Sequence, residues 1–282
     1  MSGSPLRYFP VDGRPWRLTM GLRPLDMNDW LEFDQHRDQE IAQKQSLLQH
    51  SYDAVAAVEE ESHAAQVELA QMIENVLEIE GLNSDRQSDR ELPIVWAARH
   101  IQEDLCILEH DGMRWRLTAA CVCFPSRWNL QEKIGRTLQE IHGPVPGYDE
   151  DLDSPVEDFF NRLSVDRPKW RLNWTVLDTN ELHLPSPSAR RALELPNDLG
   201  DLTFRVERQT LIRLPLTNAV VFTIRNYTAP LHVLGDRPSH LSALKDTLKT
   251  VNPEVADYKG WNDLLLPLLT WLELKSRSQG ER

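Results

Sequence analysis

The sequence predicts an α+β fold: a five-stranded antiparallel sheet with helices on one face and a helical N-terminal extension. Three observations carry this prediction. Asp111-Gly112 separates two β-prone segments, and three more β-prone segments follow residue 169. Two helical segments lie between the first two β-prone segments and the last three. Asp-Gly is a strong signal for a hairpin turn. Helices inserted into an antiparallel strand order are typical of a two-layer sheet-and-helix domain.

The first third of the chain is predicted to be helical. Residues 52–79 are rich in Ala, Glu and Gln, with apolar residues three and four positions apart, which indicates one amphipathic helix ending at Gly81. The polar stretch 81–92 then reads as a loop and the best internal boundary. We therefore expect three parts: an N-terminal extension over 1–90, a core over 91–235, and C-terminal helices over 236–282.

The remaining elements follow from turn signals and apolar spacing. Residues 105–110 and 113–124 form the hairpin. A helix is predicted over 129–142, with Asn129 as its N-cap and an apolar stripe that ends at Gly143-Pro144. The later elements are a short helix from Ser154-Pro155, strands over 170–177, 202–214 and 218–227, and helices near 239–250 and 261–274.

Charge and composition exclude several classes of protein. The 282 residues contain 31 Lys and Arg against 44 Asp and Glu, and this net charge of −13 without a basic run argues against a nucleic-acid partner. The start lacks the pattern of a signal peptide, and the longest apolar run, 264–272, is too short to span a membrane. Three cysteines form neither a disulfide framework nor an iron–sulfur site, so we expect a cytoplasmic protein.

Familiar catalytic motifs are missing from the sequence. It has no GxGxxG, no GxxxxGK[ST], no HExxH, no GxSxG and no CxxCH. The sequence therefore lacks the usual signals of dinucleotide folds, P-loops, zinc proteases, esterase elbows and covalent haem attachment.

The segment 123–148 carries the first candidate site. On one continuous helix, Gly135 and His142 would lie two turns apart on the same flat face. Gly135 fits the close approach of either a flat ligand or a neighbouring element. His142, fixed before Gly143-Pro144, fits either a rigid axial metal ligand or a residue that caps the helix end. Lys133 on this helix could meet a ligand carboxylate.

The second candidate comes from alternation along 204–214. Arg208 falls in an otherwise apolar row, and a three-residue turn at 216–218 would place it opposite Asn226. Two polar groups on an apolar surface indicate either an internal ion-pair network or the polar end of a ligand pocket. A register shift of one residue would reverse the faces.

These motifs resemble a known family. FPSRW, the segment with Lys133, Gly135 and Arg136, IHGPVPGY, RVERQTLIRLP and FTIRNY are similar to the haem-containing alpha subunit of the haem-dependent oxidative N-demethylases. The N-terminal RPWRLTMGLRPLDMNDWLEFD shares the likeness, which runs from about Trp16 to Trp271.

The resemblance implies a Per-Arnt-Sim-like fold around a five-stranded antiparallel sheet that holds non-covalent haem b. It implies His142 as the iron ligand, with His232 in reserve, and a haem pocket that includes Trp128, Lys133, Gly135 and Pro144. Arg208 and Asn226 are the expected donors to O2 at the iron, with Arg225 and Glu207 in reserve. Thiolate ligation by Cys123 is the competing iron chemistry, disfavoured because buried thiols are usually inert.

The implied activity is oxidation of an N-methyl group of a dimethylamine-like amine with O2, releasing formaldehyde. The chain shows no dinucleotide or iron–sulfur motif, so electrons from NADPH are expected through FMN and iron–sulfur partner chains in a hetero-oligomer. Two alternatives stay open: a non-catalytic haem or small-molecule sensing module, and a scaffold that has lost its cofactor.

Overall fold

The computed structural model describes residues 6–85, 88, 90–185 and 194–280, and within them seven strands form one antiparallel sheet. The strand order is β1-β5-β6-β7-β3-β4-β2. The predicted antiparallel α+β class is confirmed, but the sheet has seven strands rather than five, because two short segments extend its edges. The long strands are β3 (Asp104–His110), β4 (Trp115–Cys121), β5 (Lys169–Leu177), β6 (Thr203–Arg213) and β7 (Val220–Pro230), and the short ones are β1 (Arg23–Pro24) and β2 (Ala56–Val58).

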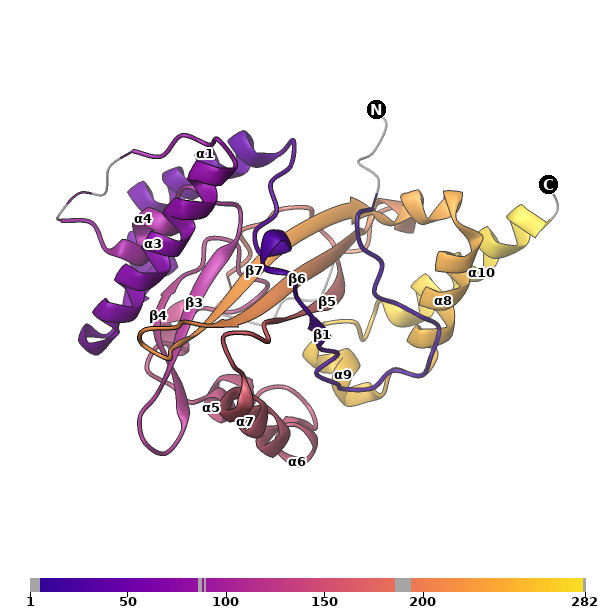
Figure 1. The fold of residues 1–282 in the computed structure, drawn as a ribbon. Coiled ribbons are helices and arrows are strands. Elements are labelled where there is room, and N and C mark those ends of the chain that lie inside the picture. The colour runs from indigo at the N-terminus through magenta and orange to yellow at the C-terminus, as the bar shows by residue number, and fades with distance from the viewer. Residues whose placement is uncertain (1–5, 86–87, 89, 186–193, 281–282) are drawn as a thin grey trace.

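Helices cover both faces of the sheet, so the expectation of one covered face is wrong. Helices α1 (Arg37–His50), α3 (His63–Ile79) and α4 (Pro93–Ala98) share an apolar core with Ile107 and Ile212. The other face packs Leu108 and Leu211 against residues of α5 (Leu138–His142) and α7 (Asp153–Arg162). Adjacent strand residues point to opposite faces. Figure 1 shows the two helix groups on different sides of the strands.

Each face is named here by a residue of β6. The Arg208 face carries Val206, Arg208 and Thr210, and the Glu207 face carries Arg205, Glu207 and Gln209. The register of β6 with β5 and with β7 is uninterrupted, so each of these residues stays on its face along the whole strand.

The C-terminal helices pack at the other end of the Arg208 face. Helices α8 (Pro238–Leu248) and α10 (Leu265–Gly280) share a core with Phe204, Val206 and Val11. Helix α9 (Pro253–Tyr258) connects them, and α6 (Tyr148–Asp151) precedes α7. No helix within the described ranges has both the length and the apolar character needed to cross a bilayer. The division at residues 90 and 235 stays a prediction.

The predicted helix over 52–79 is interrupted. Helix α2 (Tyr52–Val55) leads into β2, which pairs with β4, and α3 begins only at His63 after a 3-10 turn. The predicted end is confirmed, because Gly81 follows α3 with a φ of +65°.

The predicted hairpin is confirmed, with a longer turn than expected. His110 pairs with Trp115, so the loop has four residues, and Asp111 Oδ1 accepts hydrogen bonds from the backbone N–H groups of Met113 and Arg114 at 2.8 Å each.

The predicted continuous helix over 129–142 is wrong. A 3-10 turn at Leu130–Glu132 ends before Gly135, whose φ of +73° breaks the helix. The Gly135 N–H donates to the Leu117 carbonyl at 2.8 Å, which ties this break to β4. Helix α5 then starts with a capping box between Thr137 and Glu140 rather than at Asn129. Gly135 and His142 therefore do not share one helical face.

A buried ionic cluster fastens the N-terminal segment across the Arg208 face. Arg208 donates to the carbonyls of Trp30 (3.1 Å) and Asp29, and its Nε lies 3.5 Å from a Glu32 carboxylate oxygen. Arg225 forms ion pairs at 2.8 Å with Asp34 and with Glu40. These contacts join the segment before α1 to the central strands.

Replacing Gly135 by Ala tests the break in the helix. Inside a helix the change would stabilise the protein by about 0.8–1.0 kcal/mol. At a φ of +73° it is expected to destabilise it by about 1–2 kcal/mol. Urea unfolding measures the difference. The matched control is Gly81→Ala, at φ +65° in open space, and a similar loss is expected because the Glu59 carboxylate near Gly135 can rotate away. A more stable Gly135→Ala protein would contradict the structure.

Replacing Arg225 by Met tests the ionic cluster. The change leaves the carboxylates of Asp34 and Glu40 without their ion-pair partner, and a loss of about 3–5 kcal/mol of unfolding free energy is expected. The matched control is Arg162→Met, which removes an exposed pair with Asp158 and should cost at most about 0.5 kcal/mol. Equal losses in chemical denaturation would refute a structural role for Arg225.

Candidate functional site

The predicted pairing of Arg208 with Asn226 is wrong by one residue. In the structure Arg208 pairs with Arg225, and Asn226 pairs with Glu207. The cause is the hairpin loop between β6 and β7, which has four residues (215–218) instead of three. Arg208 and Asn226 therefore point to opposite faces of the sheet and cannot line one pocket.

Several arginine side chains of the sheet are occupied by protein contacts. Arg208 and Arg225 belong to the ionic cluster described above. Arg205 donates to Asn226 Oδ1 (3.0 Å) and to the carbonyls of Leu182 (3.0 Å) and Phe124 (2.6 Å). Arg205 and Asn226 thus hold two loops against the end of the Glu207 face, and the assignment of Arg208, Arg225 and Asn226 to O2 stays a prediction.

His142 has the geometry of a metal-ligating histidine. Its half-buried ring stacks on Tyr148 at a centroid distance of 4.6 Å, and its Nδ1 lies 2.8 Å from the Leu138 carbonyl. Burial lowers the pKa of His142, which favours the neutral ring. A neutral ring that donates from Nδ1 to a carbonyl presents the lone pair of Nε2. Nε2 makes no hydrogen bond to any residue that the structure describes.

Positive charges surround this ring. The charges of Arg171 and Lys133 lower the pKa of His142 further. Lys133 Nζ donates to the Ile141 carbonyl at 2.7 Å. Arg171, on the Glu207 face opposite Gln209, makes no hydrogen bond or ion pair within the described residues, and its Nε is buried without a partner.

Glu207 lies among these cations with one oxygen open. Its Oε2 accepts hydrogen bonds from the side-chain amides of Asn173 (3.2 Å) and Gln209 (2.9 Å), while Oε1 accepts none from a described residue. Burial lowers the pKa of Arg171 and of Lys259, and the Glu207 charge partly opposes both shifts.

Lys259, which follows α9, contacts the core of the Arg208 face. Burial lowers its pKa to about 8. Its Nζ donates to the Trp174 carbonyl at 3.2 Å and lies 5.3 Å and 5.1 Å from the ring centroids of Trp16 and Trp261. These tryptophans pack in the core beside the outer edge of β5.

The other predicted haem-site residues lie in different surroundings. Trp128 is half-buried against the apolar cluster of the Glu207 face. Gly135 lines a polar hollow of about 560 Å³ with Glu59 and Arg116. Pro144 lines a separate hollow of about 440 Å³ between the segment after His142 and α9.

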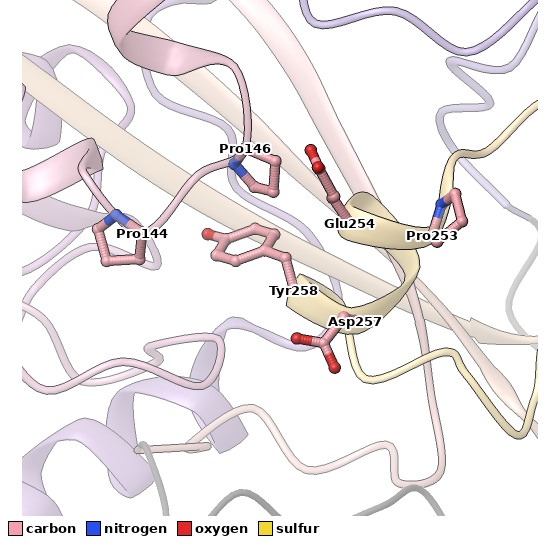
Figure 2. Close-up of a pocket in the computed structure, with 6 residues that line it drawn as sticks. All are labelled: Pro144, Pro146, Pro253, Glu254, Asp257 and Tyr258. Carbon is pink, nitrogen blue, oxygen red and sulfur yellow. The ribbon is translucent and has the colours of Figure 1, made fainter.

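The hollow beside Pro144 carries acidic side chains. Figure 2 shows the Tyr258 ring extending from α9 toward Pro144 and Pro146. Glu254 and Asp257 complete its wall, so the negative potential there attracts small cations.

Sequence reasoning missed Arg171 and His183. Arg171 belongs to a polar alternation, Lys169, Arg171, Asn173 and Thr175, that could have revealed a polar face of β5. His183 shares the geometry of His142, because its Nδ1 lies 2.7 Å from the Cys123 carbonyl. No local motif marks His183.

The reserve ligands are less suitable. His232 is exposed. A hydrogen bond with Cys121 and burial raise the pKa of the Cys123 thiol well above its ordinary value, which disfavours a thiolate ligand.

A family model described as haem-dependent oxidative N-demethylase, alpha subunit-like, matches residues 21–80 and 70–266. The match covers most of the chain, and the chain belongs to this family. The family description indicates haem dependence, an oxidative N-demethylase type of enzyme and a multi-subunit assembly.

The residues of the structure fit a haem. A haem presents iron to a neutral imidazole nitrogen and carboxylates to cations. The Nε2 of His142 and the buried Nε of Arg171 offer both kinds of partner on the Glu207 face.

Proposed function

We propose that this family member is the haem-containing oxygenase subunit of an assembly that oxidatively N-demethylates a small methylated amine. The single observation that carries the proposal is the half-buried imidazole of His142, whose Nδ1 lies 2.8 Å from the Leu138 carbonyl and whose Nε2 is free of hydrogen bonds to described residues. The family membership supplies haem as the group for that nitrogen to bind.

His142 would hold the iron of haem b through Nε2. The stacked Tyr148 ring and the Leu138 carbonyl fix the imidazole plane, so little side-chain freedom is lost on binding. Apolar side chains of the Glu207 face, among them Trp128 and Phe222, would cover the macrocycle. When bound, haem supplies one-electron chemistry with O2 that oxidises an N-methyl group.

The proposed substrate is a dimethylamine-like secondary amine. One oxygen atom of O2 enters the methyl group, and the carbinolamine formed collapses to formaldehyde and the smaller amine. The second oxygen atom leaves as water, which requires two electrons and two protons. The carboxylates of Glu254 and Asp257 would raise the local concentration of the cationic amine beside the segment after His142. Glu207 Oε1 offers an acceptor on the face that His142 occupies.

The electrons would come from NADPH through FMN and iron–sulfur centres on partner chains. This accords with the alpha-subunit description of the family. The five long strands would be the Per-Arnt-Sim-like core, and the three free, buried cysteines support a reducing, cytoplasmic setting.

Haem titration tests the ligand. The purified chain is expected to bind haem with a Soret band, and His142→Gly should lose or shift that band because Nε2 is gone. Added imidazole should restore it in His142→Gly. The matched control is His183→Gly, the other histidine with Nδ1 on a carbonyl, which should keep the wild-type spectrum. An unchanged spectrum in His142→Gly, or a wild-type chain that takes up no haem, rejects the proposal.

Reconstitution tests the reaction. With flavin and iron–sulfur reductase chains, NADPH and dimethylamine, the chain should release formaldehyde in equal molar amount to the NADPH consumed, as the electron balance requires. Ammonium, which has no methyl group, is the control substrate and should give none. A chain that binds haem but never yields formaldehyde would be a sensing module instead.

A further inference from the structure

Arg171 is a half-buried cation with no hydrogen-bond or ion-pair partner among the described residues. It lies on the Glu207 face of β5, opposite Gln209, and its Nε is inaccessible to solvent and makes no hydrogen bond. Buried polar groups in folded proteins are almost always hydrogen-bonded, so an orphaned one calls for an explanation.

Other arginines of the sheet show the contrast. Arg205 has three acceptors, and Arg208 has two carbonyls and Glu32. The Nε of Arg225 is also buried without a partner, but its terminal nitrogens hold two carboxylates. Arg213 also donates, to the carbonyls of Leu163 and Asn218. Arg171 has none of these within the described residues, although burial lowers its pKa as it does that of Arg205.

We propose that Arg171 is the receptor for a carboxylate of the bound ligand, and that this carboxylate is a propionate of the porphyrin held by His142. The proposal rests on the haem-binding function proposed above. A planar guanidinium can donate two parallel hydrogen bonds to a carboxylate, which is the strongest pairing open to Arg.

The charges near His142 support an anionic ligand. Arg171 lies two residues along β5 from Lys169, whose pairing partner Leu211 belongs to the same apolar cluster as Ile141, the neighbour of His142. Lys133 bonds the Ile141 carbonyl, and Glu207 already accepts two amide hydrogen bonds. A porphyrin has two carboxylates on one edge, and it would offset this local excess of positive charge. Lys133 keeps two further ammonium protons for the second carboxylate, because its hydrogen bond to the Ile141 carbonyl uses one.

The test compares haem with haem dimethyl ester, whose propionates are blocked, on wild-type and Arg171→Gln proteins. Arg171→Gln is expected to weaken haem binding by about 10- to 100-fold, because a charge-assisted bidentate contact is lost. Binding of the dimethyl ester should be equal in the two proteins. Arg171→Lys keeps the charge but not the planar guanidinium, so its haem affinity should lie between those of the wild type and Arg171→Gln.

Stability of the ligand-free chain separates a receptor from a structural residue. Because Arg171 has no partner to lose among the residues that the structure describes, Arg171→Gln should unfold at the same urea concentration as the wild type or at a higher one. If Arg171 were a structural residue, its replacement would lower the urea concentration at which the chain unfolds. The matched control is Arg136→Gln, an exposed arginine six residues before His142, which should leave haem affinity and stability unchanged.

The outcomes distinguish this proposal from the haem function. Equal haem affinity in wild type and Arg171→Gln overturns the receptor role while leaving the haem function intact. If haem affinity is equal but dimethylglycine, a methylamine with a carboxylate, shifts the Soret band only when Arg171 is present, Arg171 still binds a carboxylate. That carboxylate would then belong to the substrate and not to the porphyrin. Arg171-dependent binding of metal-free protoporphyrin, with no effect of His142→Gly on haem, would sustain the receptor and reject the iron ligand. A wild type that binds no porphyrin overturns both.

Discussion

The period-two alternation of the central strands is the constraint on which the rest of the structure depends. Along β5, β6 and β7, neighbouring residues point to opposite faces, so every charged side chain is committed to one face by its position. Arg208 and Arg225 fall on one side and meet carboxylates of the N-terminal segment. Arg171 and Glu207 fall on the other. The same sheet thereby has one face closed by ion pairs and one face with unfilled hydrogen-bonding capacity.

The ionic cluster on the Arg208 face supports the strands whose other side is the Glu207 face. Burying a charge in a protein is costly unless it is paired, and the ionic cluster on the Arg208 face pairs its arginines with Glu32, Asp34 and Glu40. That cluster fixes β6 and β7 from behind, and two apolar cores cover the same face. Side chains on the Glu207 face therefore stand on a rigid support. A rigid support holds the polar atoms of a site in place before a ligand arrives.

How much the sequence could predict depended on how local each signal was. The hairpin of β3 and β4, the C-terminal end of α3 and the strands β5, β6 and β7 have local signals and were predicted. The break at Gly135 was not, because the sequence around it keeps helical spacing while a hydrogen bond to Leu117 of β4 selects a left-handed glycine. The register of β6 with β7 failed for a similar reason: one extra loop residue moved Asn226 to the other face. His142 stood out from its place before Gly143-Pro144, where it fitted either a ligand or a helix cap, and the family resemblance selected the ligand. Its carbonyl partner and the absence of a described partner for Arg171 are visible only in three dimensions.

The two kinds of arginine in this sheet imply different costs and different uses. A paired arginine such as Arg225 keeps its buried carboxylates compensated, and removing it would destabilise the folded chain. This contribution to stability is present whether or not a ligand is bound. An arginine without a partner costs stability in the ligand-free chain, and it recovers that cost only when an anion binds. A ligand that binds only the folded state stabilises it in proportion to the logarithm of its concentration over its dissociation constant. Because the Arg171 Nε is already buried and the side chain starts from β5, part of the ordering that binding requires is complete beforehand, and a larger share of the pairing energy appears as affinity. Placing Arg171 on the Glu207 face therefore couples the stability of the sheet to occupancy of the site beside His142.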